Sequence, residues 1–304
     1  MSKVLVVSLN PTFQKTYMFK HFYLGEVNRE SFHVDDVSGK GINAARILTQ
    51  KNVNNSILTH LAHKDEEKML EFAKKDKLNL VYALDNKSRV RTCSTLLCED
   101  GLTTELVEES NAVSETTDSK IRELFLKEIA KCDYMLITGT RSPNYKDDIY
   151  SYFVKTAKSL NTTVVLDIAK EELKRCLQYK PDIIKPNLSE FMKTFYNQDI
   201  LENDASEGFR EKVFIKVKQL FQDLNITSII TRGTKPIWVF DNNGFYEVAV
   251  EKCEKCVNTI GCGDTLSASL IANLIENKTL KQALINASAD AKLNAMCIRP
   301  GSLY

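Results

Sequence analysis

Residues 134–167 read YMLITGTRSPNYKDDIYSYFVKTAKSLNTTVVLD, and this stretch decides the fold class. It contains two short apolar runs, Met135–Thr138 and Val164–Asp167, whose length and composition predict buried strands. Between them, the amphipathic pattern of Lys146–Ser159 predicts a helix. A strand, a helix and a second strand in succession favour a parallel crossover, because parallel strands cannot be joined by a tight turn.

The same alternation extends in both directions along the chain. We expect further strands at Val4–Leu9, Ser56–Ala62, Ile183–Lys185 and Ser228–Thr231, and further helices at Ile42–Gln50 and Phe209–Leu224. The sequence therefore predicts an α/β fold, with a doubly wound and mostly parallel sheet that is covered by helices.

Two segments, near residues 12–36 and 88–108, are rich in β-forming residues and have no helix between their strands. In the second segment, Thr92–Leu97 and Thr103–Val107 flank an Asp-Gly dipeptide, which favours a hairpin turn. We expect the two segments to form a small sheet that projects from the main one as a lid. The alternative is that they are edge strands of the main sheet. On the first interpretation, residues 1–304 form a single domain with the lid as its insertions.

The composition excludes several classes of protein. The chain has 304 residues, of which 43% are hydrophobic and 27% are charged, with a formal net charge of +1. This balance provides no general attraction to nucleic acid or to a membrane surface. No apolar run approaches the ~18 residues of a membrane span, and the first is too short for a signal peptide. We therefore expect a cytoplasmic protein with no nucleic-acid or membrane partner.

Eight cysteines do not indicate a disulfide framework in a chain of this length. Cys253 and Cys256 form a CxxC pair, but a structural zinc site needs a second pair at suitable spacing. We interpret this pair as part of a turn between strands.

The strongest motif is NTIGCGDT at residues 258–265, directly before a predicted helix. Gly261 and Gly263 allow backbone N–H groups to point into one spot, and the helix start adds the positive end of its dipole. Such a turn can hold the charge of a transferring phosphoryl group. Asp264, in the first helical turn, is either a catalytic base or a residue that only caps the helix.

Two other motifs could bind ligands. SGKGINA, at residues 38–44, loosely matches a dinucleotide fingerprint but does not follow a buried first strand. The alternatives are a turn that packs against a ligand, with Lys40 and Asn43 directed to it, or a plain tight turn. KPNLSE, at residues 185–190, follows a predicted strand, where Asn187 and Glu190 could orient Mg²⁺ or Asn187 could cap a helix. No P-loop motif is present.

In their order along the chain, these motifs resemble those of the ribokinase-like (PfkB) carbohydrate kinases, and in particular the 1-phosphofructokinase and tagatose-6-phosphate kinase branch. The resemblance covers essentially the whole chain. It rests on six places: Asn10-Pro11, Leu24–Arg29, Gly39–Asn43, Lys185–Asn187 with Glu190, Thr231–Gly233, and Asn258-Thr259 with Gly261–Asp264.

The resemblance implies an ATP-dependent enzyme in which Asp264 takes the proton from the acceptor hydroxyl. The anion hole would consist of the N–H groups of Gly261, Cys262 and Gly263. Asn187 and Glu190 would position Mg²⁺. The nucleotide would contact Lys185, Asn187, Thr231, Gly233, Asn286 and Asn294. The branch acts on ketohexose phosphates of the fructose 1-phosphate, fructose 6-phosphate and tagatose 6-phosphate type, and its lid often forms a homodimer.

A dianionic sugar phosphate needs cations, and Arg29, Lys40 and Arg91 are the candidates. The other residues that the resemblance places at the sugar are Gln14, Gly39, Asn43, Gly139 and Thr140. Gln14 stands where the branch has an aspartate. Because an amide both donates and accepts hydrogen bonds, the preferred sugar could differ.

Two other functions remain open. A kinase of a free sugar or nucleoside would not need Arg29 and Arg91. A non-catalytic sensor of sugar or nucleotide is supported only by Gln14, and the intact Gly261–Asp264 turn argues against it.

Overall fold

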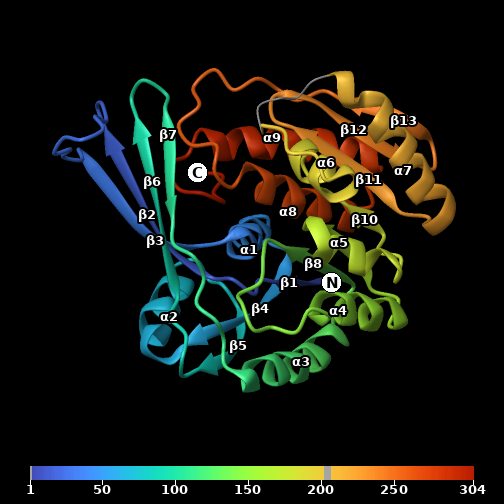
Figure 1. The fold of residues 1–304 in the computed structure, drawn as a ribbon, viewed down its shortest axis with the longest axis horizontal. Coiled ribbons are helices and arrows are strands. Elements are labelled where there is room, and N and C mark those ends of the chain that lie inside the picture. Colours follow the sequence, from blue (N-terminus) through green and yellow to red (C-terminus); the bar gives the residue numbers. More distant parts are fainter. Residues whose placement is uncertain (1, 202–206) are drawn as a thin grey trace.

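A central sheet dominates the computed structural model, which describes residues 2–201 and 207–304. Within these residues the sheet has nine strands in the order β13-β12-β11-β10-β9-β8-β1-β4-β5 (Figure 1). Neighbouring strands from β5 to β11 are parallel, and β12 and β13 are added antiparallel. The bounds are β1 (Lys3–Val7), β4 (Asn54–Ala62), β5 (Leu80–Asp85), β8 (Tyr134–Thr138), β9 (Thr163–Asp167), β10 (Ile183–Ile184), β11 (Thr227–Arg232), β12 (Lys235–Asp241) and β13 (Gly244–Val248).

Helices cover both faces of this sheet, as predicted. One face carries α1 (Lys40–Gln50), α2 (Glu66–Lys75), α8 (Cys262–Ile275) and α9 (Leu280–Ala295). The other carries α3 (Glu115–Ile129), α4 (Ile149–Ser159), α5 (Lys170–Leu177), α6 (Leu188–Tyr196) and α7 (Arg210–Leu224). In β1, Val4 and Val6 pack against the helices of the face that carries α1 and α8, while Leu5 and Val7 pack against those of the face that carries α3 and α4. Because both faces are buried, the strand is apolar throughout rather than alternating.

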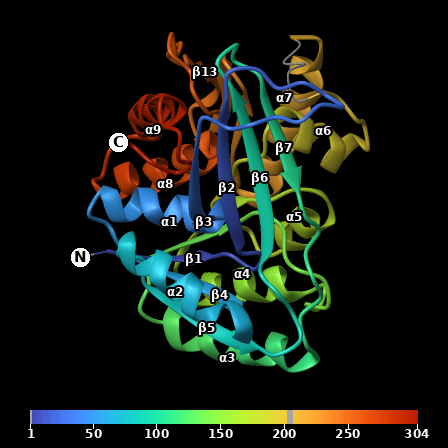
Figure 2. The ribbon, with the colours of Figure 1, turned by 90° about the vertical axis from the view of Figure 1, so that its left-hand side faces the viewer.

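The two β-rich segments form a separate sheet with the order β3-β2-β6-β7 (Figure 2). Its strands are β2 (Thr12–Phe19), β3 (Phe32–Ser38), β6 (Arg91–Cys98) and β7 (Thr103–Val107). This confirms the predicted small sheet and the β6–β7 hairpin, and it contradicts the alternative of edge strands. Thr12 pairs with both Ser38 and Arg91, so the ends of β2, β3 and β6 that lead to the rest of the chain lie together. We call this end the root of the small sheet.

Some sequence-based boundaries differ from the structure. The predicted strand at Ile183–Lys185 ends at Ile184, and the predicted helix at Lys146–Ser159 begins at Ile149. Cys253 and Cys256 lie in the segment that joins β13 to α8, so the prediction of a turn between strands was wrong. None of the helices in the described residues is long and apolar enough to cross a membrane.

Candidate active site

The glycine turn before α8 lies against the C-terminal segment of the chain. Gly261 has a φ of 83°, in the region that favours glycine, and a Cβ atom there would lie 2.6 Å from the backbone nitrogen of Gly301. The turn therefore needs glycine for two reasons, its conformation and its packing. The first N–H groups of a helix lack acceptors within the helix, so α8 presents donors at this turn. One of these donors, the N–H of Cys262, already forms a hydrogen bond of 3.3 Å with Thr259 O.

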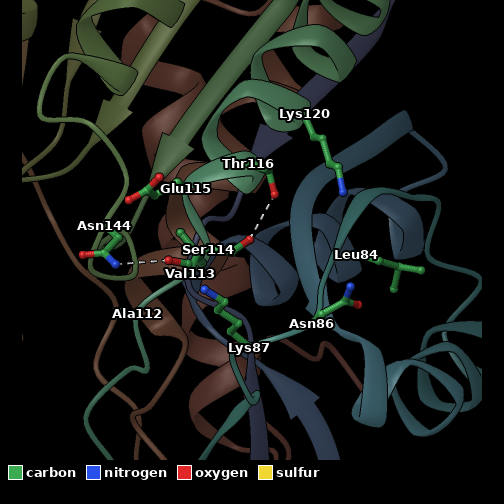
Figure 3. A pocket seen from close by; sticks show the side chains of 10 residues that line it. All are labelled: Leu84, Asn86, Lys87, Ala112, Val113, Ser114, Glu115, Thr116, Lys120 and Asn144. Carbon is green, nitrogen blue, oxygen red and sulfur yellow. Dashed lines mark hydrogen bonds between the residues drawn. The ribbon is translucent and has the colours of Figure 1, made fainter.

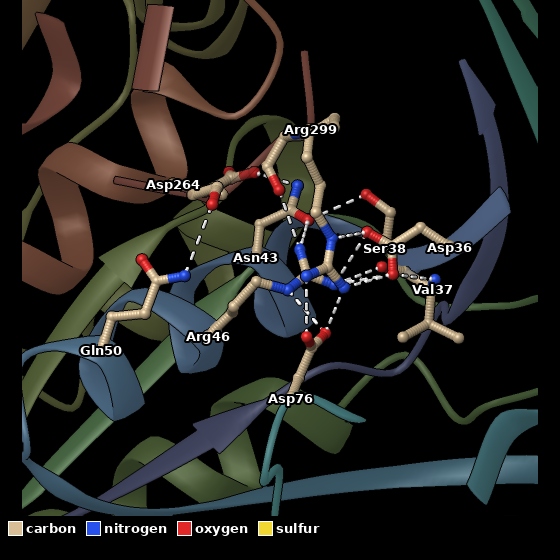
Figure 4. Close-up of polar contacts among 12 residues, drawn as sticks. Asp36, Val37, Ser38, Asn43, Arg46, Gln50, Asp76, Asp264 and Arg299 are labelled. Atoms are coloured by element: carbon tan, nitrogen blue, oxygen red, sulfur yellow. Dashed lines mark hydrogen bonds and ion pairs between the residues drawn. The ribbon is translucent and has the colours of Figure 1, made fainter. Parts of the chain in front are cut away.

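Asp264 is buried in the first turn of α8. Asn43 Nδ2, on α1, donates to Asp264 Oδ2 at 2.9 Å (Figure 4). Burial raises the pKa of Asp264 to about 6, and the charge of Lys40 and the hydrogen bond from Asn43 only partly oppose this shift. The N-cap of α8 is Gly261, and no side chain caps it, so Asp264 does not have the capping role that the sequence left open. A carboxylate that titrates near neutral pH suits a general base.

A second buried carboxylate, Asp167 at the end of β9, lies beside the same turn. Lys185 Nζ lies 3.1 Å from Asp167 Oδ2, and Ser267 Oγ on α8 donates to the same oxygen at 2.8 Å. Burial alone would raise the pKa of Asp167, but Lys185 and Lys40 bring it below its usual value. The sequence analysis missed Asp167 and Ser267. The one available signal was an aspartate at the carboxyl end of a predicted parallel strand, where ligands bind in such sheets.

Lys40, the first residue of α1, faces three carboxylates. Its Nζ donates to Glu190 Oε1 at 3.3 Å, and its side chain is 45% exposed. Burial would lower its pKa, but Asp167, Glu190 and Asp264 together raise it above the ordinary value. Lys40 is therefore a permanent cation that remains accessible to an anionic ligand.

Backbone turns with positive φ flank this lysine. Gly39 has a φ of 103°, and a Cβ atom there would lie 3.1 Å from Asn10 O. Gly139, with a φ of 80°, packs against the stem of Lys40. Gly39 follows β3 of the small sheet, so the glycine motif lacks the strand context of a dinucleotide fingerprint.

Asn187 and Glu190 form a capping box at the start of α6. Asn187 Oδ1 accepts from Glu190 N at 2.7 Å, and Asn187 N donates to Glu190 Oε2 at 3.0 Å. The capping alternative is thus confirmed. Glu190 Oε1 faces Lys40 and stays outside the box. Carboxylate oxygens of Glu190 and Asp167 at one sheet edge are donors that suit Mg²⁺, which keeps several waters and takes few protein ligands. Among the described residues, no group of three or more His, Cys, Asp or Glu could hold an ion alone.

The root of the small sheet adjoins the turn before α1, because a Cβ atom on Gly39 would lie 3.7 Å from Thr12 Oγ1. Arg91 Nε donates to Thr12 Oγ1 at 2.9 Å, and the buried Gln14 donates from Nε2 to Thr95 Oγ1 at 2.9 Å. Thr140 is tied to this region, because its Oγ1 accepts from Asn10 Nδ2 at 2.9 Å.

Arg29 is the one predicted cation that lies apart. It is exposed in the connection between β2 and β3, at the end of the small sheet away from the root. The fold of one chain does not bring it to Asp264.

The predicted nucleotide residues are divided between two regions. Thr231 bridges to Asn187, and Gly233 forms the following turn with a φ of 59°. On α9, Asn286 donates to Asn273 Oδ1 of α8 at 2.7 Å. Asn294 is fully buried, and its Oδ1 accepts from Gly301 N at 2.7 Å while its Nδ2 donates to Ile260 O at 2.9 Å. Asn294 thus fastens the C-terminal segment to the glycine turn.

A pocket of about 510 Å³ lies elsewhere, between the end of β5 and the start of α3 (Figure 3). None of the predicted site residues lines it. It is lined by Leu84, Asn86, Lys87, Ala112, Val113, Ser114, Glu115, Thr116, Lys120 and Asn144. The convergence of carboxylates, lysines and a helix start places the candidate active site at Asp264 instead.

Known carbohydrate kinases resemble this chain over nearly its whole length. The model of the pfkB family of carbohydrate kinases matches residues 7–301. The tagatose-6-phosphate kinase of Staphylococcus epidermidis is 25% identical over 295 residues, which cover 96% of this chain and 92% of that protein.

Solved structures share the fold. Phosphofructokinase-2 of Escherichia coli in complex with fructose-6-phosphate has a TM-score of 0.84 and 17% identity, covering 97% of this chain and 94% of that one. The ribokinase of Giardia lamblia has a TM-score of 0.78 and 14% identity, covering 98% and 95%.

Proposed function

This chain belongs to the pfkB family of carbohydrate kinases, and we propose that it transfers the γ-phosphoryl group of ATP to a hydroxyl of a ketohexose phosphate. The observation that carries this proposal is the position of Asp264, which is buried at the start of α8 beside the glycine turn. With a pKa of about 6, its carboxylate is ionised at neutral pH and can accept the proton of the attacking hydroxyl.

The remaining groups stabilise charge. The N–H groups of the Gly261–Gly263 turn and the dipole of α8 favour the anionic phosphoryl group, and Lys40 adds a permanent positive charge. Lys185 neutralises Asp167 and can contact phosphate oxygens at the same sheet edge. Mg²⁺ brought with ATP would neutralise the β- and γ-phosphates. Glu190 and Asp167 would hold its water ligands, and Thr231 and Gly233 would line the nucleotide.

The acceptor is assigned to phosphorylated sugars on two grounds. The curated relative is named for tagatose 6-phosphate, and one structural neighbour was solved with fructose-6-phosphate. Arg91 at the root of the small sheet supplies a guanidinium that suits a phosphate. Gln14, in the same sheet, would contact the sugar hydroxyls.

The small sheet also suits a homodimer. Its outer strands and connections carry exposed apolar side chains, namely Leu24, Val27, Phe32, Leu106 and Val107. A surface of this kind commonly marks a protein–protein contact. A homodimer through this sheet would also bring Arg29 of one copy toward a neighbouring lid.

The test is ADP formation from Mg·ATP with a panel of ketohexose phosphates and the matching free sugars. We expect turnover with a phosphosugar and its loss in Asp264→Asn. A free sugar with a higher kcat/KM than its phosphate would favour the free-sugar kinase instead. Nucleotide and sugar binding without ADP release would favour the sensor.

A further inference from the structure

Arg46, on α1, is a buried charge that the proposed mechanism does not use. Its guanidinium contacts five acceptors (Figure 4). They are Asp76 Oδ2 (2.8 Å), Val37 O (2.6 Å), Pro300 O (2.8 Å), and Asn43 Oδ1 and Asp36 Oδ1 (both 3.3 Å). Buried ion pairs contribute little net stability, because desolvation offsets their attraction. The residue therefore calls for an explanation other than stability.

Its contact with Asn43 fixes the orientation of an amide that faces the base. Asn43 Oδ1 accepts from Ser38 Oγ at 2.9 Å and from Arg46, so Nδ2 is left to donate to Asp264 Oδ2. A flipped amide would direct N–H groups at the Arg46 cation and an oxygen at the Asp264 carboxylate. Arg46 thus selects the end of the amide that meets the base.

Its contact with the Pro300 carbonyl supports the glycine turn. The next residue, Gly301, has a φ of 64°, and its nitrogen packs against Gly261. A Cβ atom on Gly301 would lie 2.7 Å from the Asn43 Cα atom, so the C-terminal turn is wedged between Asn43 and Gly261. The Arg46 guanidinium therefore contacts both Asn43, which packs against Gly301, and the carbonyl of Pro300, which precedes it.

We propose that Arg46 is a positioning residue for phosphoryl transfer, which holds the Asn43 amide toward Asp264 and the Pro300–Gly301 turn against Gly261. This inference rests on the proposed kinase function.

Arg299 provides a matched comparison within the same cluster. It pairs with the same two carboxylates, through contacts that include Nη2 to Asp36 Oδ1 at 2.6 Å and Nη1 to Asp76 Oδ1 at 2.7 Å. No hydrogen bond links its side chain to Asn43 among the contacts of the described residues. A general loss of charge pairing would affect both arginines alike, whereas the contact with the Asn43 amide belongs to Arg46 and not to Arg299.

The experiment compares Arg46→Lys with Arg299→Lys, which both keep the net charge. Lysine cannot reproduce the planar fork that reaches Asn43 and Pro300 while it keeps Asp76. The carboxyl carbons of aspartate are labelled with ¹³C, and the Asp264 resonance is assigned by its absence in Asp264→Asn. NMR then follows its titration in the full-length protein without substrate.

We expect the Asp264 pKa to stay near its wild-type value in Arg299→Lys. In Arg46→Lys it should rise by about one unit, because a hydrogen bond to the charged carboxylate is weakened. Lys40, Asp167 and Lys185 also face Asp264 and are the same in all proteins. Arg46→Met, which removes every donor, should give the same or a larger rise.

An unchanged pKa in the folded Arg46 variants, or an equal rise in Arg299→Lys, would overturn the positioning role. If circular dichroism shows that one Arg46 variant does not fold, the Asp264 pKa of the other variant tests the proposal. The acid limb of kcat should move with the NMR pKa while KM for ATP stays unchanged. Because the titration needs no turnover, a shift in a chain that transfers no phosphoryl group would refute the kinase function but keep the conclusion that Arg46 orients the Asn43 amide toward Asp264.

Discussion

Replacing Gly261 with alanine places a methyl group against the backbone nitrogen of Gly301, at 2.6 Å. The left-handed φ of 83° costs a non-glycine residue about 1–2 kcal/mol. The backbone contact cannot be relieved by rotating a side chain, so overpacking adds about 1–3 kcal/mol. The free energy of unfolding should therefore fall by about 2–5 kcal/mol in Gly261→Ala.

Gly25 is the matched control for this substitution. Its φ is 81°, and no atom lies within 4 Å of the position that a Cβ would take. Gly25→Ala should thus lose only the conformational part, about 1–2 kcal/mol. Urea denaturation of both variants separates the two contributions. Because the displaced turn would also misalign the N–H donors of the proposed anion hole, kcat should fall about 10²-fold in Gly261→Ala and stay unchanged in Gly25→Ala. Equal losses of stability in the two variants would refute the packing argument.

Three further predictions concern charge and capping. Asp264→Asn should lower kcat about 10²–10⁴-fold, and a loss of activity below threefold would contradict the base. It should also raise stability at pH 7 by up to about 3 kcal/mol, because the raised pKa of the folded state means that wild-type stability is lost as pH rises from 3.8 to about 6. Burial lowers the pKa of His60 to about 4, so stability should fall as pH drops from 6.5 toward 4, and His60→Gln should flatten this slope in thermal melts; an unchanged slope would mean that other groups cause it. Asn187→Ala should lose about 1 kcal/mol in urea denaturation through the capping box, whereas Asn187→Ser should retain most of it.

The fold was largely predictable because its signals are local. The apolar run of β1 and the helix between β8 and β9 are visible in short windows, and Asp-Gly marked the hairpin of the small sheet. The pairing of β1 between β4 and β8 was not visible, since it depends on contacts between segments that lie far apart in the sequence.

Candidate site residues could be identified only where a short sequence motif indicates a particular chemistry. The place of Asp264 at the start of a helix could be predicted because it follows a double-glycine turn, and its role as the base stays a prediction. Asp167 has partners that lie 18 and 100 residues away, Lys185 and Ser267, and no local pattern announces them. Arg46 sits inside a helix that is buried along most of its length, and sequence could not show that its charge is internal.

Because the small sheet joins the rest of the chain at its root, it resembles a beam that is fixed at one end. Its connections to the main sheet leave from one end, near Thr12, Ser38, Arg91 and Val107. The contacts of the opposite tip lie within the small sheet and its own connections, as between His21 and Asp100 and between Phe19 and Phe22. Eight residues of strand extend about 26 Å. A pivot of about 10° at the root therefore displaces the tip by about 4–5 Å but moves Gln14 and Arg91 by only a fraction of that. A partner bound at the exposed tip would therefore act through a long lever arm, and small shifts of Gln14 and Arg91 would follow from large movements of the tip.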